Sequence, residues 1–213
     1  MKYDVNMDKR RYVQRVRAEA AEGTRRRILH AARETLERGP VGALRVDEVA
    51  RQAGVSRSTV YLLYGSRAGL FDALGRHLRD EAGFDELISA YRRPDALEAM
   101  REAQRAAVRM YALMPDLARG LFTLAAIDPD GVAAVSAIED GRRPGATSLV
   151  ERLGAQGYLR EGISLSEAAD MLTVITSFQA FDQLFGAGLP AEVVADRLVA
   201  MTERSICRPD LLG

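Results

Sequence analysis

Apolar residues recur along this chain of 213 residues at spacings of three and four, which place side chains on one face of a helix. Over about the first 80 residues, this pattern predicts four helices, which end at Gly39-Pro40, at Gly54, near Tyr64 and near Glu81. No alternating strand pattern competes with it. We therefore predict an all-α protein.

The remainder of the chain continues the helical spacing between turn signals. Ser164 to Glu167 form a capping box, which begins a helix whose apolar stripe extends to Phe185. Pro190 begins the last helix, and Pro144-Gly145 is expected to break or kink an earlier one. Residues 83–213 are thus predicted to be a helical domain with broad apolar faces on its last two helices.

The second and third predicted helices are separated by a very short turn. Gly54 can adopt the left-handed conformation, and the hydroxyl of Ser56 can accept a backbone N–H at the start of the next helix. Two helices joined in this way form a helix-turn-helix unit, whose second helix enters the DNA major groove. We place this motif at about residues 45–64 and its reading helix at 57–64.

The side chains of the predicted reading helix suit DNA. Its first turn, the part of such a helix that reaches base edges, carries Arg57, Ser58 and Thr59. Leu62 and Leu63 donate no hydrogen bond, so each packs either on thymine methyl groups or in the core. The residues expected to contact bases are Arg57, Ser58, Thr59 and Leu62.

The segments AGVSRSTVY (residues 53–61), Tyr64-Gly-Ser-Arg67 and Gly69-Leu70-Phe71 together resemble the TetR family of one-component transcriptional regulators. The resemblance implies an N-terminal three-helix DNA-binding domain and a C-terminal helical domain that encloses a small-molecule pocket. It also implies a homodimer that forms through the last two helices. The expected divisions are a basic N-terminal extension over 1–21, the DNA-binding domain over 22–82 and the ligand-binding and dimerisation domain over 83–213.

The resemblance further implies phosphate contacts around the reading helix. Arg45 stands where the family usually has a capping Thr or Ser, and such a cap is worth about 0.5–2 kcal/mol. Arg67 stands where the family has lysine, which keeps the positive charge. Thr24 is also the expected N-cap of the first helix. The expected phosphate contacts are Thr24, Arg25, Arg45, Ser56, Tyr61, Tyr64 and Arg67.

Charge supports a nucleic-acid partner at one end of the molecule. Thirty basic and thirty acidic side chains cancel, but the basic residues are concentrated in the first 80 residues and the acidic ones in the rest. A basic region binds DNA with an affinity that falls steeply as salt rises. Residues 1–21 either add phosphate or minor-groove contacts or form a solvated tail or helical extension.

Several other classes of protein are disfavoured. No apolar run is long enough to span a membrane and no signal-peptide core is present, so a cytoplasmic protein is expected. Cys207 is the lone cysteine, and His30 and His77 have no partners at metal-ligand spacing. No nucleophile motif or phosphate-binding glycine loop occurs. We therefore expect no catalytic residue, no metal and no cofactor.

The expected function is that of a sequence-specific transcriptional regulator, with repression as the default. It would bind a palindromic operator in double-stranded DNA and be released by a small-molecule effector. The alternative is a helical dimeric carrier or scaffold without specific DNA binding. The acidic body favours a neutral or cationic effector, although surface carboxylates explain that acidity equally well. Candidate pocket residues, for each of which an ordinary core or surface role competes, are Gln104, Arg109, Tyr111, Met114, Phe122, Met171, Phe178 and Phe181.

Overall fold

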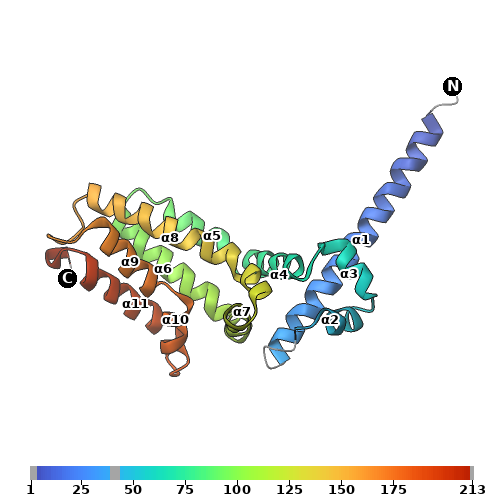
Figure 1. Cartoon of the computed structure of the whole chain (residues 1–213). Coiled ribbons are helices and arrows are strands. Elements are labelled where there is room, and N and C mark those ends of the chain that lie inside the picture. The colour runs from blue at the N-terminus through green and yellow to red at the C-terminus, as the bar shows by residue number, and fades with distance from the viewer. Residues whose placement is uncertain (1–3, 39–43, 212–213) are drawn as a thin grey trace.

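The structure, a computed structural model, describes residues 4–38 and 44–211 (Figure 1). Within these residues the regular structure is helical, apart from one antiparallel bridge between Leu159 and Cys207. The helices are α1 (Asp4–Arg38), α2 (Val46–Gln52), α3 (Arg57–Tyr64), α4 (Arg67–Glu81), α5 (Phe84–Tyr91), α6 (Ala96–Leu113), α7 (Pro115–Ile127), η2 (Pro129–Gly131), α8 (Val132–Ala155), α9 (Leu165–Ile175), α10 (Phe178–Phe185), α11 (Ala191–Ile206) and η3 (Pro209–Leu211).

Helices α1, α2 and α3 form a head at one end of the molecule, and α5 to α11 form a body at the other (Figure 1). The apolar core of the head is formed by buried side chains of α1, α2, α3 and α4, and it continues into the body through buried residues of α7 and α8. Ile28, Val49, Val60 and Leu70 are among these side chains, and each is almost fully buried. The all-helical fold predicted from the sequence is confirmed.

Helix α1 is longer than the first predicted helix. Its N-terminal part projects away from the rest of the head (Figure 1). Thr24, the expected N-cap, lies inside this helix and donates its hydroxyl to the carbonyl of Ala20 at 2.9 Å. The assignment of Thr24 as a cap was therefore wrong, because alanine, glutamate and arginine before it are strong helix formers that continue the helix. The predicted end of this helix at Gly39-Pro40 lies outside the described residues.

Helix α4 joins the head to the body (Figure 1). Its middle packs directly against the start of α8 at Gly75. A Cβ atom at this position would lie 2.0 Å from the carbonyl oxygen of Ala134, so only glycine permits the observed approach of the two helices. The buried side chains of Phe71, Leu74 and Leu78, on the same helix, belong to the apolar cluster that the head shares with α7 and α8. Helix α4 is thus packed into both parts of the protein.

The body differs from the expected helix boundaries at two places. Pro144-Gly145 was expected to break or kink a helix, and α8 continues through both residues without a break. Packing of α8 against α4, α6 and α9 compensates for the backbone hydrogen bond that proline cannot make. Conversely, the single helix expected up to Phe185 is interrupted at Thr176 and Ser177. The hydroxyl of Ser177 accepts the N–H of Ala180 at 3.2 Å and begins α10 as a separate helix.

Candidate nucleic-acid interface and internal cavity

The exposed helix of the head, α3, is fixed at its start by a network of hydroxyl groups. Ser56 accepts the backbone N–H of Thr59 at 3.1 Å, and its oxygen lies 2.8 Å from the hydroxyls of both Ser58 and Thr59. Gly54 supplies the turn before it with a φ of 66°. Val60 on the opposite side is buried in the head core. The N-terminal turn of α3 is therefore held in place while its outer face stays open.

The outer face of α3 combines one cation with one apolar side chain. Arg57 is 60% exposed, with its guanidinium 5.5 Å from the ring centroid of Tyr61 and its Nη1 3.2 Å from Asp47 Oδ1. The Tyr61 hydroxyl, followed by Asp47, raises the pKa of Arg57, so the side chain stays charged. Leu62 is 85% exposed, which is an unfavourable environment for a large apolar group unless a partner covers it. Such a face can donate hydrogen bonds to guanine and cover a thymine methyl group.

Around α3, Ser56, Ser58, Arg25 and Arg45 are exposed, while Thr24, Thr59 and Tyr61 are partly buried. Arg45 begins α2 without a side-chain cap, as its replacement of Ser or Thr predicted. The hydroxyl of Tyr64 donates to the carbonyl of Arg25 at 3.1 Å, and burial raises the pKa of this tyrosine to about 12. Tyr64 therefore joins α3 to α1, and its proton is already used within the head.

Arg67, another of the expected phosphate contacts, is paired with body carboxylates in this structure. Its Nη1 donates to Asp128 Oδ1 at 2.9 Å and to Asp130 Oδ2 at 3.2 Å, and its Nη2 donates to Asp128 Oδ2. The guanidinium also lies over the ring of Phe71, 4.7 Å from its centroid. Asp128 in turn accepts the backbone N–H of Asp130 and so shapes the turn between α7 and α8. The structure therefore ties Arg67 to the α7–α8 turn of the body, while its Nη2 also lies 3.5 Å from the carbonyl of Leu44, the residue before Arg45.

The body contains a partly open cavity of about 470 Å³ between α4, α5, α6, α8 and α9. Its wall is largely apolar, and Phe84, Tyr91 and Tyr111 supply aromatic surface. Gln104 lines it as well, donating from Nε2 to Thr202 Oγ1 at 2.9 Å, while its buried Oε1 has no hydrogen-bond partner among the described residues. The volume falls within the range of small-molecule sites in proteins.

Only some of the pocket residues predicted from the sequence line this cavity. Gln104 and Tyr111 line the cavity. Met114, Phe122, Phe178 and Phe181 do not line it; they pack around one end of α6, where the Phe122 and Phe178 rings stack at 4.6 Å.

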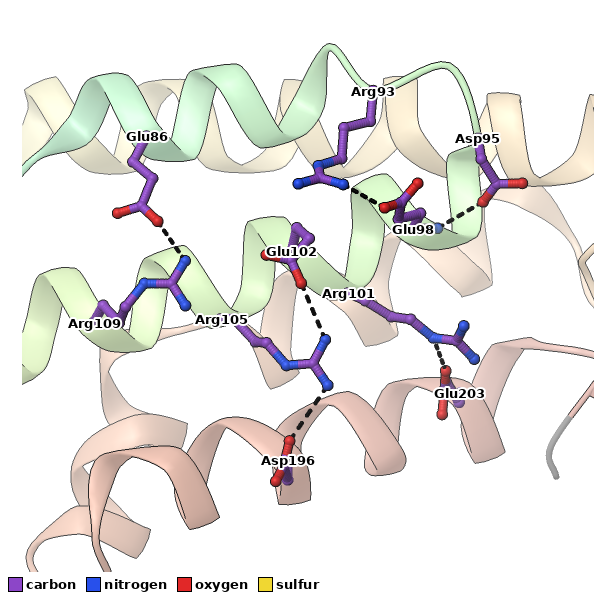
Figure 2. A network of polar contacts seen from close by, with 10 residues as sticks. All are labelled: Glu86, Arg93, Asp95, Glu98, Arg101, Glu102, Arg105, Arg109, Asp196 and Glu203. Carbon is purple, nitrogen blue, oxygen red and sulfur yellow. Dashed lines mark hydrogen bonds and ion pairs between the residues drawn. The ribbon is translucent and has the colours of Figure 1, made fainter.

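Arg109 and Met171 also lie outside the cavity wall. Arg109 projects from the outer side of α6 and pairs with Glu86 at 2.5 Å, within a network of ion pairs that joins α5, α6 and α11 (Figure 2). Met171 packs on the apolar cluster that contains the lining residues Met100, Leu149 and Leu172, but it does not line the cavity itself. The cavity residues that sequence reasoning missed are carried mainly by α5 and α8. The amphipathic segment FDELISAY was the available signal for α5, whereas α8 has little amphipathic pattern to reveal its inner face.

Neither a metal site nor a membrane span is apparent in the described ranges. No three His, Cys, Asp or Glu side chains gather there in a group that can hold a metal ion. None of the helices formed by those residues is both long and apolar enough to cross a bilayer.

The sequence of the head is similar to that of known DNA-binding proteins. Residues 28–74 match the family model described as "Bacterial regulatory proteins, tetR family". The HTH-type transcriptional repressor LfrR of Mycolicibacterium smegmatis is 48% identical over 61 residues. That match covers 29% of this chain and 31% of LfrR, so it spans less than a third of either protein.

Solved structures share the fold over nearly the whole chain. NalD, the secondary repressor of the MexAB-OprM multidrug efflux pump in Pseudomonas aeruginosa, has a TM-score of 0.69 at 22% identity, covering 89% of this chain and 98% of that one. The fatty acid degradation regulator FadR from Bacillus halodurans has a TM-score of 0.64 at 14% identity, covering 83% and 96%. At these identities the likeness shows the fold alone.

Proposed function

We propose that this chain, whose residues 28–74 match the model of the tetR family of bacterial regulatory proteins, is a transcriptional repressor that binds a palindromic operator as a homodimer. A small molecule held in the body cavity releases it from DNA. The observation that carries the proposal is the outer face of α3, where a charged Arg57 and an uncovered Leu62 stand on a capped helix. A carrier or scaffold without DNA binding has no use for that face.

In this proposal α3 enters the major groove. Arg57 donates to a guanine edge, Leu62 packs on a thymine methyl group, and Ser58 and Thr59 contact neighbouring bases. Arg25 and Arg45, both exposed, pair with phosphates on either side. Tyr64 acts from within the head by holding α3 against α1.

The homodimer is proposed to form through α9, α10 and α11. Helices α9 and α11 leave large apolar side chains in solvent, namely Leu165, Val174, Val193 and Met201. A second copy of the same face would remove them from water, and an isologous contact of this kind has two-fold symmetry. Two heads related by a two-fold axis match the two halves of a palindrome.

Release is proposed to pass through α4. This helix carries Arg67 against the body carboxylates at its start, Gly75 against α8 in its middle and Arg79 in the cavity wall near its end. A ligand that prefers a different position of α4 also changes the position of α3, which precedes it by only two residues. Such a ligand lowers DNA affinity by as much as its own affinity differs between the two positions.

The test is selection of bound DNA from a random duplex pool, followed by affinity measurements as a function of salt concentration. The expected result is an enriched palindrome with half-sites about one helical turn apart. Arg57→Ala is expected to weaken binding to that sequence by about 1–3 kcal/mol with little change on random DNA. Arg109→Ala, outside the head, serves as the matched control and should leave both affinities unchanged. Weak, salt-sensitive binding with no enriched sequence would favour the carrier or scaffold instead.

A further inference from the structure

The cavity wall is positively charged. Three of the residues that line it are arginines, Arg79, Arg142 and Arg152, and no aspartate or glutamate belongs to the described lining. This arrangement is opposite to the one expected from the acidity of the whole body. The cavity thus has a different electrostatic character from the surface that surrounds it.

Two of the three arginines have their hydrogen bonds satisfied by the protein. Arg152 donates to the backbone carbonyls of Tyr91, Arg93 and Pro94, and so holds the end of α5. Arg142 donates to the Glu139 carboxylate at 2.5 Å and to the carbonyl of Thr173. These two guanidinium groups are part of the wall's own structure.

Arg79 differs from both of them. Its Nε is buried without a hydrogen-bond partner, and its polar contact within the described residues is a weak one, 3.4 Å from Nη2 to the largely exposed carboxylate of Asp80. Its guanidinium lies over the ring of Phe84, another lining residue, 5.0 Å from the centroid. Stacking on a ring leaves the N–H groups at the edge of the guanidinium free to donate. Among the three arginines of the wall, Arg79 is therefore the one whose charge is not balanced by a close ion pair or by several hydrogen bonds.

We propose that the cavity binds an anionic amphiphile, a molecule with an apolar body and one acidic group, and that Arg79 holds the acidic group. This inference rests on the proposed effector role of the cavity and names the chemical class of the effector. The apolar part lies against Phe84, Tyr91 and Tyr111, which a largely apolar wall of about 470 Å³ accommodates. Because Arg79 belongs to α4, the acidic group acts directly on the helix that joins the body to the head.

The competing occupant is a cation paired with Glu139. One oxygen of this carboxylate is buried without a partner among the described residues, and burial, followed by the charge of Glu139, raises the pKa of the nearby Tyr111. However, Glu139 is not part of the lining, and its other oxygen already accepts two hydrogen bonds from Arg142. The pair is neutral as a whole, so the positive charge of Arg79 and Arg152 dominates the cavity.

The test compares three probes with the same apolar chain and different head groups: dodecanoate, dodecanol and dodecylammonium. Their binding to the full-length protein is measured by calorimetry at pH 7, below the concentrations at which they form micelles. Hydrogen bonds to a charged group predict that dodecanoate binds about 10- to 100-fold more tightly than dodecanol. Dodecylammonium is expected to bind most weakly of the three.

Variants then assign the preference to one residue. Arg79→Met keeps an unbranched apolar stem on Phe84 and should reduce the advantage of dodecanoate to less than about threefold, with dodecanol affinity unchanged. Arg109→Met, an arginine on the outer side of α6, should keep the full preference. Equal binding of the three probes, a preference for dodecylammonium that Glu139→Gln removes, or an Arg79→Met variant that keeps the preference for dodecanoate would each overturn the inference.

These measurements are independent of DNA, so the two proposals can fail separately. If none of the three probes binds while the protein still selects a palindrome, the ligand class is wrong and the regulator stands. If dodecanoate binds through Arg79 but does not release the operator, the ligand class stands and release through the cavity is wrong.

Discussion

Replacing Arg67 by alanine distinguishes a link between head and body from a DNA contact. The guanidinium is 30% exposed and donates to Asp128, which is 22% exposed, and to the more exposed Asp130. Hydrogen bonds to charged groups contribute about 1.5–3 kcal/mol, and partial exposure reduces this toward the 1 kcal/mol typical of surface pairs. We therefore expect a loss of about 1–2 kcal/mol of unfolding free energy. That loss corresponds to a fall in Tm of about 2–4 °C for each kcal/mol in a chain of this size.

The decisive assay is the dependence of operator affinity on salt. Each phosphate contact contributes about 0.9 to the slope of log affinity against log salt, so losing one contact in each protomer lowers the slope by about 1.8. If Arg67 holds the body carboxylates in the DNA complex as it does here, Arg67→Ala leaves this slope unchanged. Arg45→Ala, at an exposed position beside α3, is the matched control and should lower the slope by the full amount.

Substitution of Asp128, the ion-pair partner of Arg67, tests the same contact from its other side. Asp128→Asn should reproduce the loss of stability seen for Arg67→Ala, and the double variant should lose little more than either single one, because both changes remove the same contact. A salt slope that falls by about 1.8 in Arg67→Ala, together with additive stability losses, would refute the reasoning and return Arg67 to the phosphate-contacting set.

Three further predictions concern Leu62, two helical glycines and the titration of Asp128. Leu62→Asn should reduce the preference for thymine over uracil at one position of the selected operator, measured as the ratio of affinities, whereas Arg57→Ala should leave that ratio unchanged. Gly75→Ala should lower Tm by forcing α4 and α8 apart, while Gly23→Ala, with nothing within 4 Å of the new Cβ, should raise stability by about 0.5–1 kcal/mol. The Arg67 guanidinium holds the pKa of Asp128 below its usual range. The ionised carboxylate therefore stabilises the fold above about pH 4, and this stabilisation is lost as the pH falls through the lowered pKa of Asp128. The difference in Tm between the unmodified protein and Asp128→Asn should shrink in acid.

The parts of the fold that sequence reasoning anticipated are governed by local signals. Gly54, Ser56 and the apolar spacing around Val60 act within a few residues of one another, and the structure places a left-handed turn, an N-cap and a buried face at those positions. Helix α4 likewise begins and ends where its pattern indicated, at Arg67 and Glu81. Local structure of this kind can be predicted from one sequence because each signal restricts the backbone conformation at its own position.

The features that were missed depend on residues far apart in the chain. Arg67 meets Asp128 across 61 positions, and the cavity wall combines Arg79 with residues of α5 and α8. Pro144 has the local properties of a helix breaker, yet packing on both sides keeps α8 continuous. The break at Ser177 was different, because its N-cap signal was present in the sequence but was outweighed by the apolar stripe that continues to Phe185.

The position of the two arginines on α4 constrains how an effector can act. Arg67 and Arg79 are twelve residues apart, so about 18 Å of one helix separates the carboxylates of the α7–α8 turn from the cavity. A hydrogen-bonded helix transmits a displacement along its length without absorbing it, and α3 follows any movement of its start through the two-residue connection of Gly65 and Ser66. A ligand that draws Arg79 must therefore move α4, and α3 with it, against the contact that holds Arg67 to the body. Loss of that contact removes this resistance, so Arg67→Ala should lower the dodecanoate concentration that releases the operator.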